Sequence, residues 1–255
     1  MKKFFFISGL PRSGSTLLST ILKQNPNISA GITSPLLHYV RTMLEATNEG
    51  NKQDFDEQRT KRILDAVIKS YYDNVQTPII FDTNRLWTNL LPQLKDLYPY
   101  TKVLCCVRDI NWILDSFERL HQTNPYSIST VFPKDKDFNV YSRTDSLMND
   151  TGLVRLPYDS LKSAMKGMHK DMLMLIDYEI LCQQPEGVLK AIYNFLELDY
   201  FEHDFNNVQI SYDEYDRDIK LKNLHTTGQR VESRYRETIL PPDVINRYKD
   251  LEVWK

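Results

Sequence analysis

A glycine-containing loop near the start of the chain has the residue types needed to hold an anion. The loop, residues 9–16, reads GLPRSGST and lies between a short apolar run and a segment with apolar residues at helical spacing. In a strand–loop–helix unit, backbone N–H groups and the positive end of the helix dipole converge on a phosphate or sulfate group. The alternative is an ordinary turn between a strand and a helix. The residues we expect to bind the anion are Pro11, Arg12, Ser13, Gly14, Ser15 and Thr16.

The position of the cation in this loop narrows the kind of ligand. Gly9 and Gly14 have the spacing of the nucleoside-triphosphate loop G-x-x-x-x-G-K-[ST], but Ser15 stands at the lysine position and the cation is Arg12. An arginine presents a planar fork to one anionic group. The loop resembles the 5′-phosphosulfate loop of sulfotransferases that use 3′-phosphoadenosine 5′-phosphosulfate (PAPS). The residue sequence of the loop is most similar to that of the tyrosylprotein and bacterial branches of the family.

Arg108 and Ser116 form a second candidate anion site. Arg108 ends an apolar strand-like run, and Ser116 follows eight residues later on a predicted helix that Asp109 caps. A guanidinium fork and a hydroxyl can together hold a phosphate monoester. The pair resembles the 3′-phosphate clamp of the sulfotransferases, although an arginine and a serine without a shared task remain the alternative.

Two later segments extend the resemblance. Residues 172–196 are similar to a family segment whose tyrosine lies by the adenine, which assigns that role to Tyr178, although Tyr178 could equally be a core residue at a strand end. Residues 228–244 resemble the loop that closes over the nucleotide. The resemblance makes Arg230, Arg234 and Arg236 candidates for a second contact to the 3′-phosphate, whereas exposed arginines of a polar loop are usually only solvated.

The residues for catalysis depart from the family pattern. In the tyrosylprotein branch a glutamate base and a catalytic lysine occupy the positions that are Thr33 and Thr83 here. Sulfuryl transfer needs cations on the developing charge and a base for the acceptor hydroxyl. We expect Arg12 and Arg85 to supply the cations and Asp82 or His38 the base. Asp82 could instead only orient Arg85 or a loop, His38 could be a half-buried helix residue, and His225 could approach from the C-terminal loop.

Composition excludes several classes of protein. The chain has 255 residues, of which 41% are hydrophobic and 26% charged, and a formal net charge of −2. This balance favours a globular enzyme over a nucleic-acid-binding protein. The three cysteines lack metal-ligand spacing, so we expect no metal and a reducing, cytoplasmic location. We expect neither a signal peptide, because the first apolar run is too short, nor a membrane span.

Apolar periodicity predicts alternating strands and helices. Such alternation indicates a single α/β domain over residues 1–255, a P-loop-like three-layer fold whose parallel sheet is flanked by helices. Residues 122–156 lack periodicity and are expected to form an acceptor-side loop, and residues 199–255 are expected to cover the nucleotide. Expected strands are 3–8, 79–82, 102–107 and 172–177, and expected helices are 15–24, 35–48, 56–73, 88–98, 110–121, 157–170 and 186–197.

The sequence therefore predicts a PAPS-dependent sulfotransferase that needs no metal and releases 3′-phosphoadenosine 5′-phosphate (PAP). Its acceptor would be a hydroxyl or amine of a small molecule, glycan or peptide. Two alternatives stay open. One is a P-loop nucleotide kinase or hydrolase, for which Asp82 would be the metal-binding carboxylate. The other is a catalytically inactive PAP-binding protein, which the threonines at positions 33 and 83 would explain.

Overall fold

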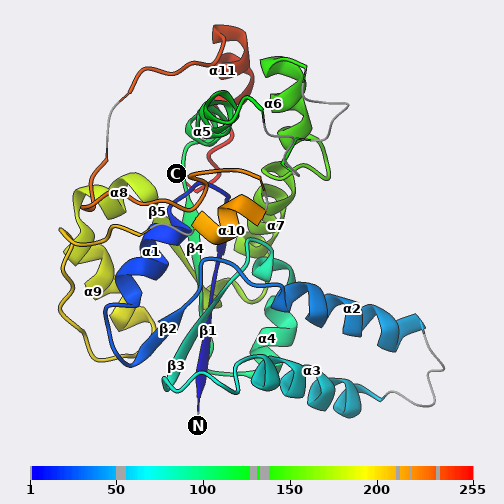
Figure 1. The fold of residues 1–255 in the computed structure, drawn as a ribbon. Coiled ribbons are helices and arrows are strands. Elements are labelled where there is room, and N and C mark those ends of the chain that lie inside the picture. The colour runs from blue at the N-terminus through cyan, green and yellow to red at the C-terminus, as the bar shows by residue number, and fades with distance from the viewer. Residues whose placement is uncertain are drawn as a thin grey trace.

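A five-stranded parallel sheet forms the centre of the molecule (Figure 1). The computed structural model describes residues 2–49, 56–126, 131–132, 138–210, 213–218, 220–233 and 236–254. The strand order is β2-β3-β1-β4-β5, and every pairing is parallel. The predicted α/β class is confirmed. The strands are β1 (Lys3–Gly9), β2 (Ile28–Ala30), β3 (Ile79–Thr83), β4 (Val103–Val107) and β5 (Leu173–Asp177).

The central strand β1 supplies both faces of the core. Phe4 and Phe6 belong to one apolar cluster, whereas Phe5 and Ile7 belong to the other, and all four side chains are buried. Alternation of this kind places successive side chains on opposite faces of a sheet. Because both faces are covered, the strand reads as one continuous apolar run, as is typical of parallel sheets.

Helices cover both faces of the sheet. The first face packs against α1 (Ser15–Leu22), α8 (Tyr178–Gln183) and α9 (Pro185–Phe195). On the opposite face lie α2 (Leu36–Glu49), α3 (Glu57–Tyr71), α4 (Leu91–Leu97) and α7 (Arg155–Lys166), together with the short 3₁₀ helices η1 (Trp87–Leu90) and η3 (Lys170–Met172). The three predicted layers are therefore present, with α2 and α3 extending away from the sheet (Figure 1).

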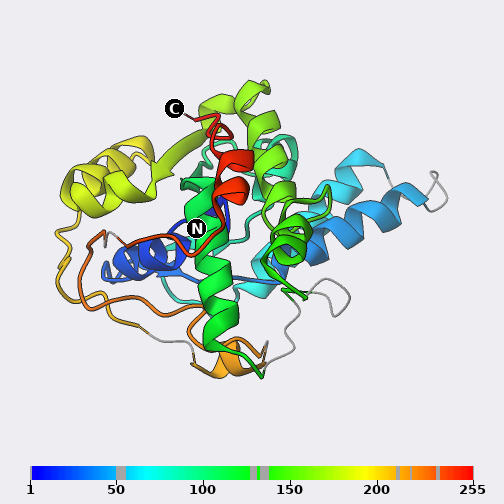
Figure 2. The same cartoon turned by 90° about the horizontal axis from the view of Figure 1, so that it is seen from above.

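A third apolar cluster lies beyond the carboxyl ends of the strands. It joins α5 (Ile110–Thr123), α6 (Val140–Met148) and α11 (Pro242–Tyr248) to Leu10 of the glycine loop. Seen from above, α5 crosses the middle of the molecule and the last part of the chain runs beside it (Figure 2). This cluster places the glycine loop, the clamp helix α5 and the C-terminal segment at the same end of the sheet.

Several element predictions need correction. The three-residue strand β2 was missed because it has no apolar run, and α8 was missed because it follows β5 directly. The helix expected over 88–98 is split into η1 and α4, with Pro92 in the first turn of α4. The helix expected over 157–170 starts two residues earlier and ends at Lys166, where Gly167 is the C-cap.

The segment 122–156 is not a loop throughout. Helix α6 lies inside it and begins with a capping box in which Asn139 and Ser142 bond each other's backbone N–H groups. Val140, Thr144, Leu147 and Met148 have helical spacing, and the last three are buried, so a periodic signal was present in the sequence. The acceptor-side role of this segment stays a prediction.

Two strips in the last part of the chain are joined by backbone hydrogen bonds, and one of them packs on the sheet layers. Val208 N donates to Gln229 O at 2.9 Å, and Thr227 N donates to Ile210 O at 3.1 Å. Val208 is buried in the cluster that contains α1 and α9. The excursion between these paired strips includes α10 (Asp213–Asp218).

Candidate functional site

The glycine loop is fixed against strand β4 by its backbone. Gly9 has a φ of +104°, and a Cβ placed there would lie 2.6 Å from the backbone nitrogen of Cys106. Leu10 N donates to Cys106 O at 2.8 Å, and the hydroxyl of Ser13 donates to the same oxygen at 2.9 Å. Only glycine fits this close approach. Ser13 is buried and its hydroxyl bonds inside the loop, so the anion contact predicted for Ser13 would come from its backbone N–H group.

The loop ends at the amino terminus of α1, which has no side-chain cap and no acidic residue in its first turn. Gly14 is the N-cap with a φ of +93°, and a Cβ there would lie 2.6 Å from the Tyr178 ring. Arg12 also has a positive φ, of 57°, which non-glycine residues rarely adopt. The backbone is thus held in an unusual conformation at the place where helix N–H groups can receive an anion.

The two clamp residues do not bond each other in this structure. Ser116 Oγ instead accepts from Nε of Arg12 at 3.0 Å, and Arg12 Nη1 donates to the carbonyl oxygen of Leu224. Arg108 lies over the Tyr178 ring, with its guanidinium carbon 4.0 Å from the ring centroid, and its Nη2 is 3.1 Å from Glu179 Oε1. The loop arginine therefore reaches the clamp serine, while the clamp arginine lies on the tyrosine.

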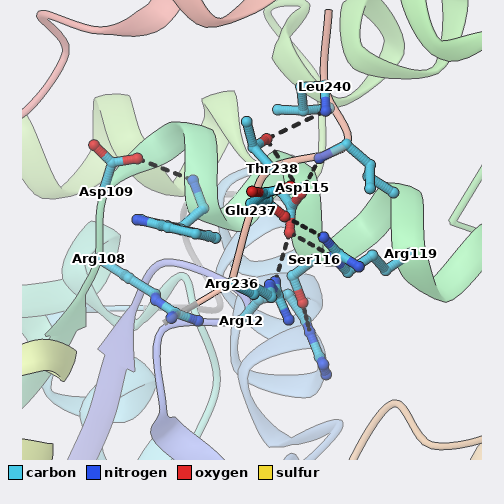
Figure 3. Close-up of polar contacts among 12 residues, drawn as sticks. Arg12, Arg108, Asp109, Asp115, Ser116, Arg119, Arg236, Glu237, Thr238 and Leu240 are labelled. Carbon is cyan, nitrogen blue, oxygen red and sulfur yellow. Dashed lines mark hydrogen bonds and ion pairs between the residues drawn. The ribbon is translucent and has the colours of Figure 1, made fainter. Parts of the chain in front are cut away.

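A buried carboxylate beside the clamp serine holds the C-terminal segment in place (Figure 3). Asp115 of α5 is fully buried, and its Oδ2 is 2.7 Å from Arg236 Nη2 and 2.9 Å from Arg119 Nε. Its other oxygen accepts from Ile239 N at 2.8 Å and from Thr238 Oγ1 at 3.2 Å. This carboxylate fixes Arg236 next to the clamp, where Figure 3 shows it near Arg12.

Three arginines therefore converge at this end of the site. Burial, together with the positive charges of Arg108 and Arg236, lowers the pKa of Arg12 to about 10, against the opposing effect of Asp216. Cations crowded in this way repel one another unless an anion lies among them. The cluster is suited to a group with more than one negative charge.

The arginines border a cleft of about 770 Å³ at the carboxyl ends of the strands. The structure brings together at this cleft nine of the predicted site residues, namely Pro11, Arg12, Gly14, Ser15, Thr16, Arg85, Arg108, Ser116 and Tyr178. Thr33 and Thr83, which stand at the family's glutamate and lysine positions, also line it. Arg230 is a lining residue as well, whereas Arg234 lies outside the described residues, between Ser233 and Arg236.

Asp82 does not line the cleft. Its side chain is buried on the other face of β3, where Oδ2 accepts from the hydroxyl of Tyr72 at 2.5 Å and Oδ1 accepts from Nε1 of Trp87 at 2.6 Å. Burial raises the pKa of Asp82, and hydrogen bonds from Ser34, Tyr72 and Trp87 oppose that rise. The position indicates a structural role in joining α3 and η1 to the sheet.

His38 does not line the cleft either, and it is exposed on α2. The sequence placed His38 on a helix as a possible base, but it could not show which side of that helix faces the site. Among the described residues, no group of three His, Cys, Asp or Glu side chains could hold a metal ion. None of the described helices has both the length and the apolar character needed to cross a membrane.

Two ionisable lining residues were not among the selected site residues, although the sequence indicated that His225 could approach from the C-terminal loop. His225 and Glu232 both border the cleft and come from the C-terminal segment. His225 Nδ1 is 2.7 Å from Oδ1 of the buried Asp216, on α10. A histidine followed by a Thr-Thr-Gly turn was visible in the sequence, but its carboxylate partner lies nine residues upstream in a segment without clear periodicity.

Comparisons with known proteins agree on one family. The model of the family described as "Sulfotransferase family" matches residues 5–202. A putative protein-tyrosine sulfotransferase of Caenorhabditis briggsae is 24% identical over 206 residues, covering 78% of this chain and 67% of that protein. Protein-tyrosine sulfotransferase A of Caenorhabditis elegans is 21% identical over 237 residues, covering 89% of this chain and 57% of that protein.

Solved structures share the fold. A retinol dehydratase crystallised in a complex with retinol and PAP superposes with a TM-score of 0.53 at 14% identity, covering 97% of this chain and 79% of that one. This likeness confirms the arrangement of sheet and helices. The chain spans about two thirds and somewhat more than half of the two nematode proteins.

Proposed function

Because the chain belongs to the sulfotransferase family, we propose that it transfers a sulfuryl group from PAPS to a hydroxyl or amine acceptor. The observation that carries the proposal is the convergence of Arg12, Arg108 and Arg236 beside Ser116 at one end of the cleft. The same loop has serine where nucleoside-triphosphate enzymes have their lysine. A nucleotide with a charged group at each end of its ribose fits these features.

The residues present fit the donor in two places. The Gly9–Thr16 loop and the uncapped start of α1 would hold the 5′-phosphosulfate through backbone N–H groups. Arg108, Ser116 and Arg236 would hold the 3′-phosphate, since all three border the cleft next to Asp115, which orients Arg236. Tyr178, whose ring lies next to Gly14 of the loop, would lie beside the adenine. PAPS supplies an activated sulfur that needs no metal for its transfer.

The other end of the cleft would receive the acceptor. Thr33, Thr83 and Arg85 line it, with Val131 and Leu153 from the segment after α5. Arg85 is exposed and would stabilise the charge that develops on the transferring group, together with Arg12. The acceptors named for the nematode relatives are protein tyrosines, so a peptide hydroxyl is one acceptor class that we propose, beside small molecules and glycans.

Calorimetry with PAP in the presence of EDTA tests the donor proposal. We expect PAP to bind without metal and more tightly than ATP or AMP, because only PAP carries the 3′-phosphate. Binding that requires Mg²⁺, or ATP binding as tight as PAP binding, would contradict the proposal. Asp82 gives little support to a metal-dependent kinase, because it is buried outside the cleft.

An assay of transfer separates an active enzyme from an inactive PAP-binding protein. Sulfur-labelled PAPS is incubated with the protein and a panel of tyrosine peptides, phenols and sugars, and labelled product is counted. We expect label in at least one acceptor class. Tight PAP binding without any transfer or sulfate release would favour the inactive protein, for which Thr33 and Thr83 are the supporting residues.

We also propose a reducing, cytoplasmic location. Cys105, Cys106 and Cys182 are all free and buried, and burial raises the pKa of the Cys106 thiol to about 12. Thiols in this state are unreactive and need no oxidising compartment. Fractionation of cells that express the tagged protein, with the cytosolic fraction as the expected site, checks the location.

A further inference from the structure

A histidine and a buried aspartate form a pair at the edge of the cleft. His225 Nδ1 is 2.7 Å from Asp216 Oδ1, and the backbone N–H of His225 donates to the other oxygen of Asp216 at 2.8 Å. The Asp216 side chain is 1% exposed and that of His225 is 16% exposed. One carboxylate thus fixes both the backbone and the ring of the histidine that borders the cleft.

The turn that carries the pair is itself anchored to α5. Asn124, at the end of α5, accepts from Lys222 N at 3.1 Å and donates to Lys222 O at 3.3 Å. Leu221 N donates to Asp216 O at 2.9 Å and closes the turn after α10. The ring of His225 is therefore positioned by α5, the helix that also carries the clamp serine.

The pair lies close to both cations assigned to the reaction. The carbonyl of Leu224, next to His225, accepts from Arg12 of the donor loop, and the charge of Arg85 at the acceptor end also acts on His225. A base for the acceptor must lie between the transferring group and the acceptor hydroxyl, within hydrogen-bond reach of the latter. Among the described residues that line the cleft, His225 and Glu232 are the side chains with a suitable proton-accepting atom.

We propose that His225 is the general base of the sulfuryl transfer and that Asp216 is the positioning residue that orients it; this inference rests on the proposed function. As the acceptor oxygen bonds to sulfur, the acceptor proton passes to Nε2 of His225. The bond between sulfur and the bridging oxygen of PAPS breaks, and its electron pair leaves with PAP. The imidazolium then releases the proton to solvent, so no other reactant is needed.

The surroundings of the ring support this assignment. An ionised carboxylate only accepts hydrogen bonds, so Asp216 requires the proton on Nδ1 and leaves the lone pair on Nε2. Burial lowers the pKa of His225, and Arg12 and Arg85 lower it further, while Asp216 opposes them. The ring is therefore neutral, and able to accept a proton, near neutral pH.

The proposal is tested with variants whose PAP affinity is measured in parallel. His225→Gln and Asp216→Asn are compared with the controls His169→Gln and with Asp218→Asn, an exposed carboxylate on the same helix as Asp216. The probes are PAPS with water as acceptor and PAPS with phenols of increasing acidity, ending with 4-nitrophenol. Turnover is followed by release of labelled sulfate or by labelled aryl sulfate.

We expect His225→Gln to lower kcat by about 100-fold or more for weakly acidic phenols, with PAP affinity retained. The loss should shrink as the phenol becomes more acidic, because an ionised phenol has no proton to give up. The wild-type kcat should fall below a midpoint lower than about 6.5, the ordinary histidine value, and His225→Gln should lack this acid limb. An equal loss for every phenol, or a rate unchanged from wild type, overturns the proposal.

The role of Asp216 has a readout that does not depend on turnover. Nitrogen-15 spectra of the imidazole in the PAP complex should show the proton on Nδ1 in the wild type. Asp216→Asn should shift it toward Nε2, because an amide can donate to Nδ1, and kcat should fall about tenfold or more. An unchanged tautomer, or collapse of activity in Glu232→Gln instead, contradicts the assignment. Wild-type protein that binds PAP but never turns over defeats the proposed function itself.

Discussion

The two ends of the cleft are built differently. At the end that we propose for the donor, Arg12 lies in a strained glycine loop, Arg108 lies on the Tyr178 ring, and the buried carboxylate of Asp115 holds Arg236. At the acceptor end, Thr33 and Thr83 are small and neutral, and Thr83 uses its hydroxyl to bond Gly31 O at 2.6 Å. The proposed donor end is therefore charged and closely packed, whereas the residues that we propose for the acceptor end include one exposed cation, Arg85.

This difference separates the part of the chain that we assign to donor binding from the part that we assign to proton transfer. We propose that donor binding depends on the strand–loop–helix unit and α5. The proton acceptor that we assign comes from the excursion after residue 210, which is anchored to α5 through Asn124 and to the glycine loop through Leu224. Changes at the donor end should therefore affect stability and PAP affinity, and changes at the acceptor end should affect turnover.

The largest effect should follow Gly9→Ala. The new Cβ would lie against the backbone of Cys106, 2.6 Å from its nitrogen, in a backbone conformation with φ of +104°. We expect the free energy of unfolding to fall by more than about 3 kcal/mol, measured by urea denaturation. The matched control is Gly187→Ala in α9, where nothing lies within 4 Å of the new Cβ, and it should not destabilise. Equal stability of the two variants would show that the loop is not rigid.

Arg108→Ala should weaken PAP binding by about 2–3 kcal/mol, because it removes a charge-assisted contact to a partly buried phosphate. Adenosine 5′-phosphosulfate lacks the 3′-phosphate, so its affinity should hardly change. Calorimetry with both ligands measures the difference, with Arg155→Ala as a control that removes a half-exposed guanidinium elsewhere. If both ligands lose affinity equally, Arg108 supports Tyr178 rather than the phosphate.

Arg85→Ala should lower kcat by about 10- to 100-fold while the affinity for PAP stays the same. The reason is that a cation matched to the transition state contributes little to ground-state binding. Single-turnover transfer measures the effect, and Arg85→Lys should recover part of the rate because the charge is restored. A near-normal rate in Arg85→Ala would indicate that an arginine of the C-terminal segment supplies the cation instead.

The smallest effect on turnover is expected from Asp82→Asn. Because Asp82 bonds Tyr72 and Trp87 away from the cleft, kcat should stay within about threefold of wild type. Stability should fall by about 1–2 kcal/mol, since an amide cannot accept from both donors in the same way. A large loss of kcat with unchanged stability would restore Asp82 as a candidate base.

Most residues that we propose for the donor end could be selected from the sequence, and they line one cleft, because their signals are local. Glycines at fixed spacing, an arginine inside the loop and a serine eight residues after Arg108 are all readable from short segments. The sequence did not indicate that Ser116 would bond Arg12 while Arg108 lies on the Tyr178 ring. That arrangement depends on where Leu224 and Tyr178 come to lie, which no local pattern contains.

The acceptor end could not be predicted in the same way. Asp82 ends a strand like a typical site carboxylate, but strand alternation turned it toward Tyr72 and Trp87. His225 became a candidate through Asp216 and Asn124, and Asn124 lies on a different element nearly a hundred residues away. Long-range contacts of this kind depend on how the elements pack together. Helix and strand propensity and apolar periodicity describe single elements and do not predict that packing.

The hydrogen bonds of Arg12 have a consequence for how the protein is made. Its guanidinium reaches Ser116, 104 residues later, and Leu224, 212 residues later. Synthesis runs from the amino terminus, so the glycine loop leaves the ribosome long before the carbonyl that completes its contacts exists. Contacts of such high sequence separation also form late because the chain must close a long loop first. We expect a nascent chain that ends before residue 220 to carry the loop and its exposed arginine without a working nucleotide site.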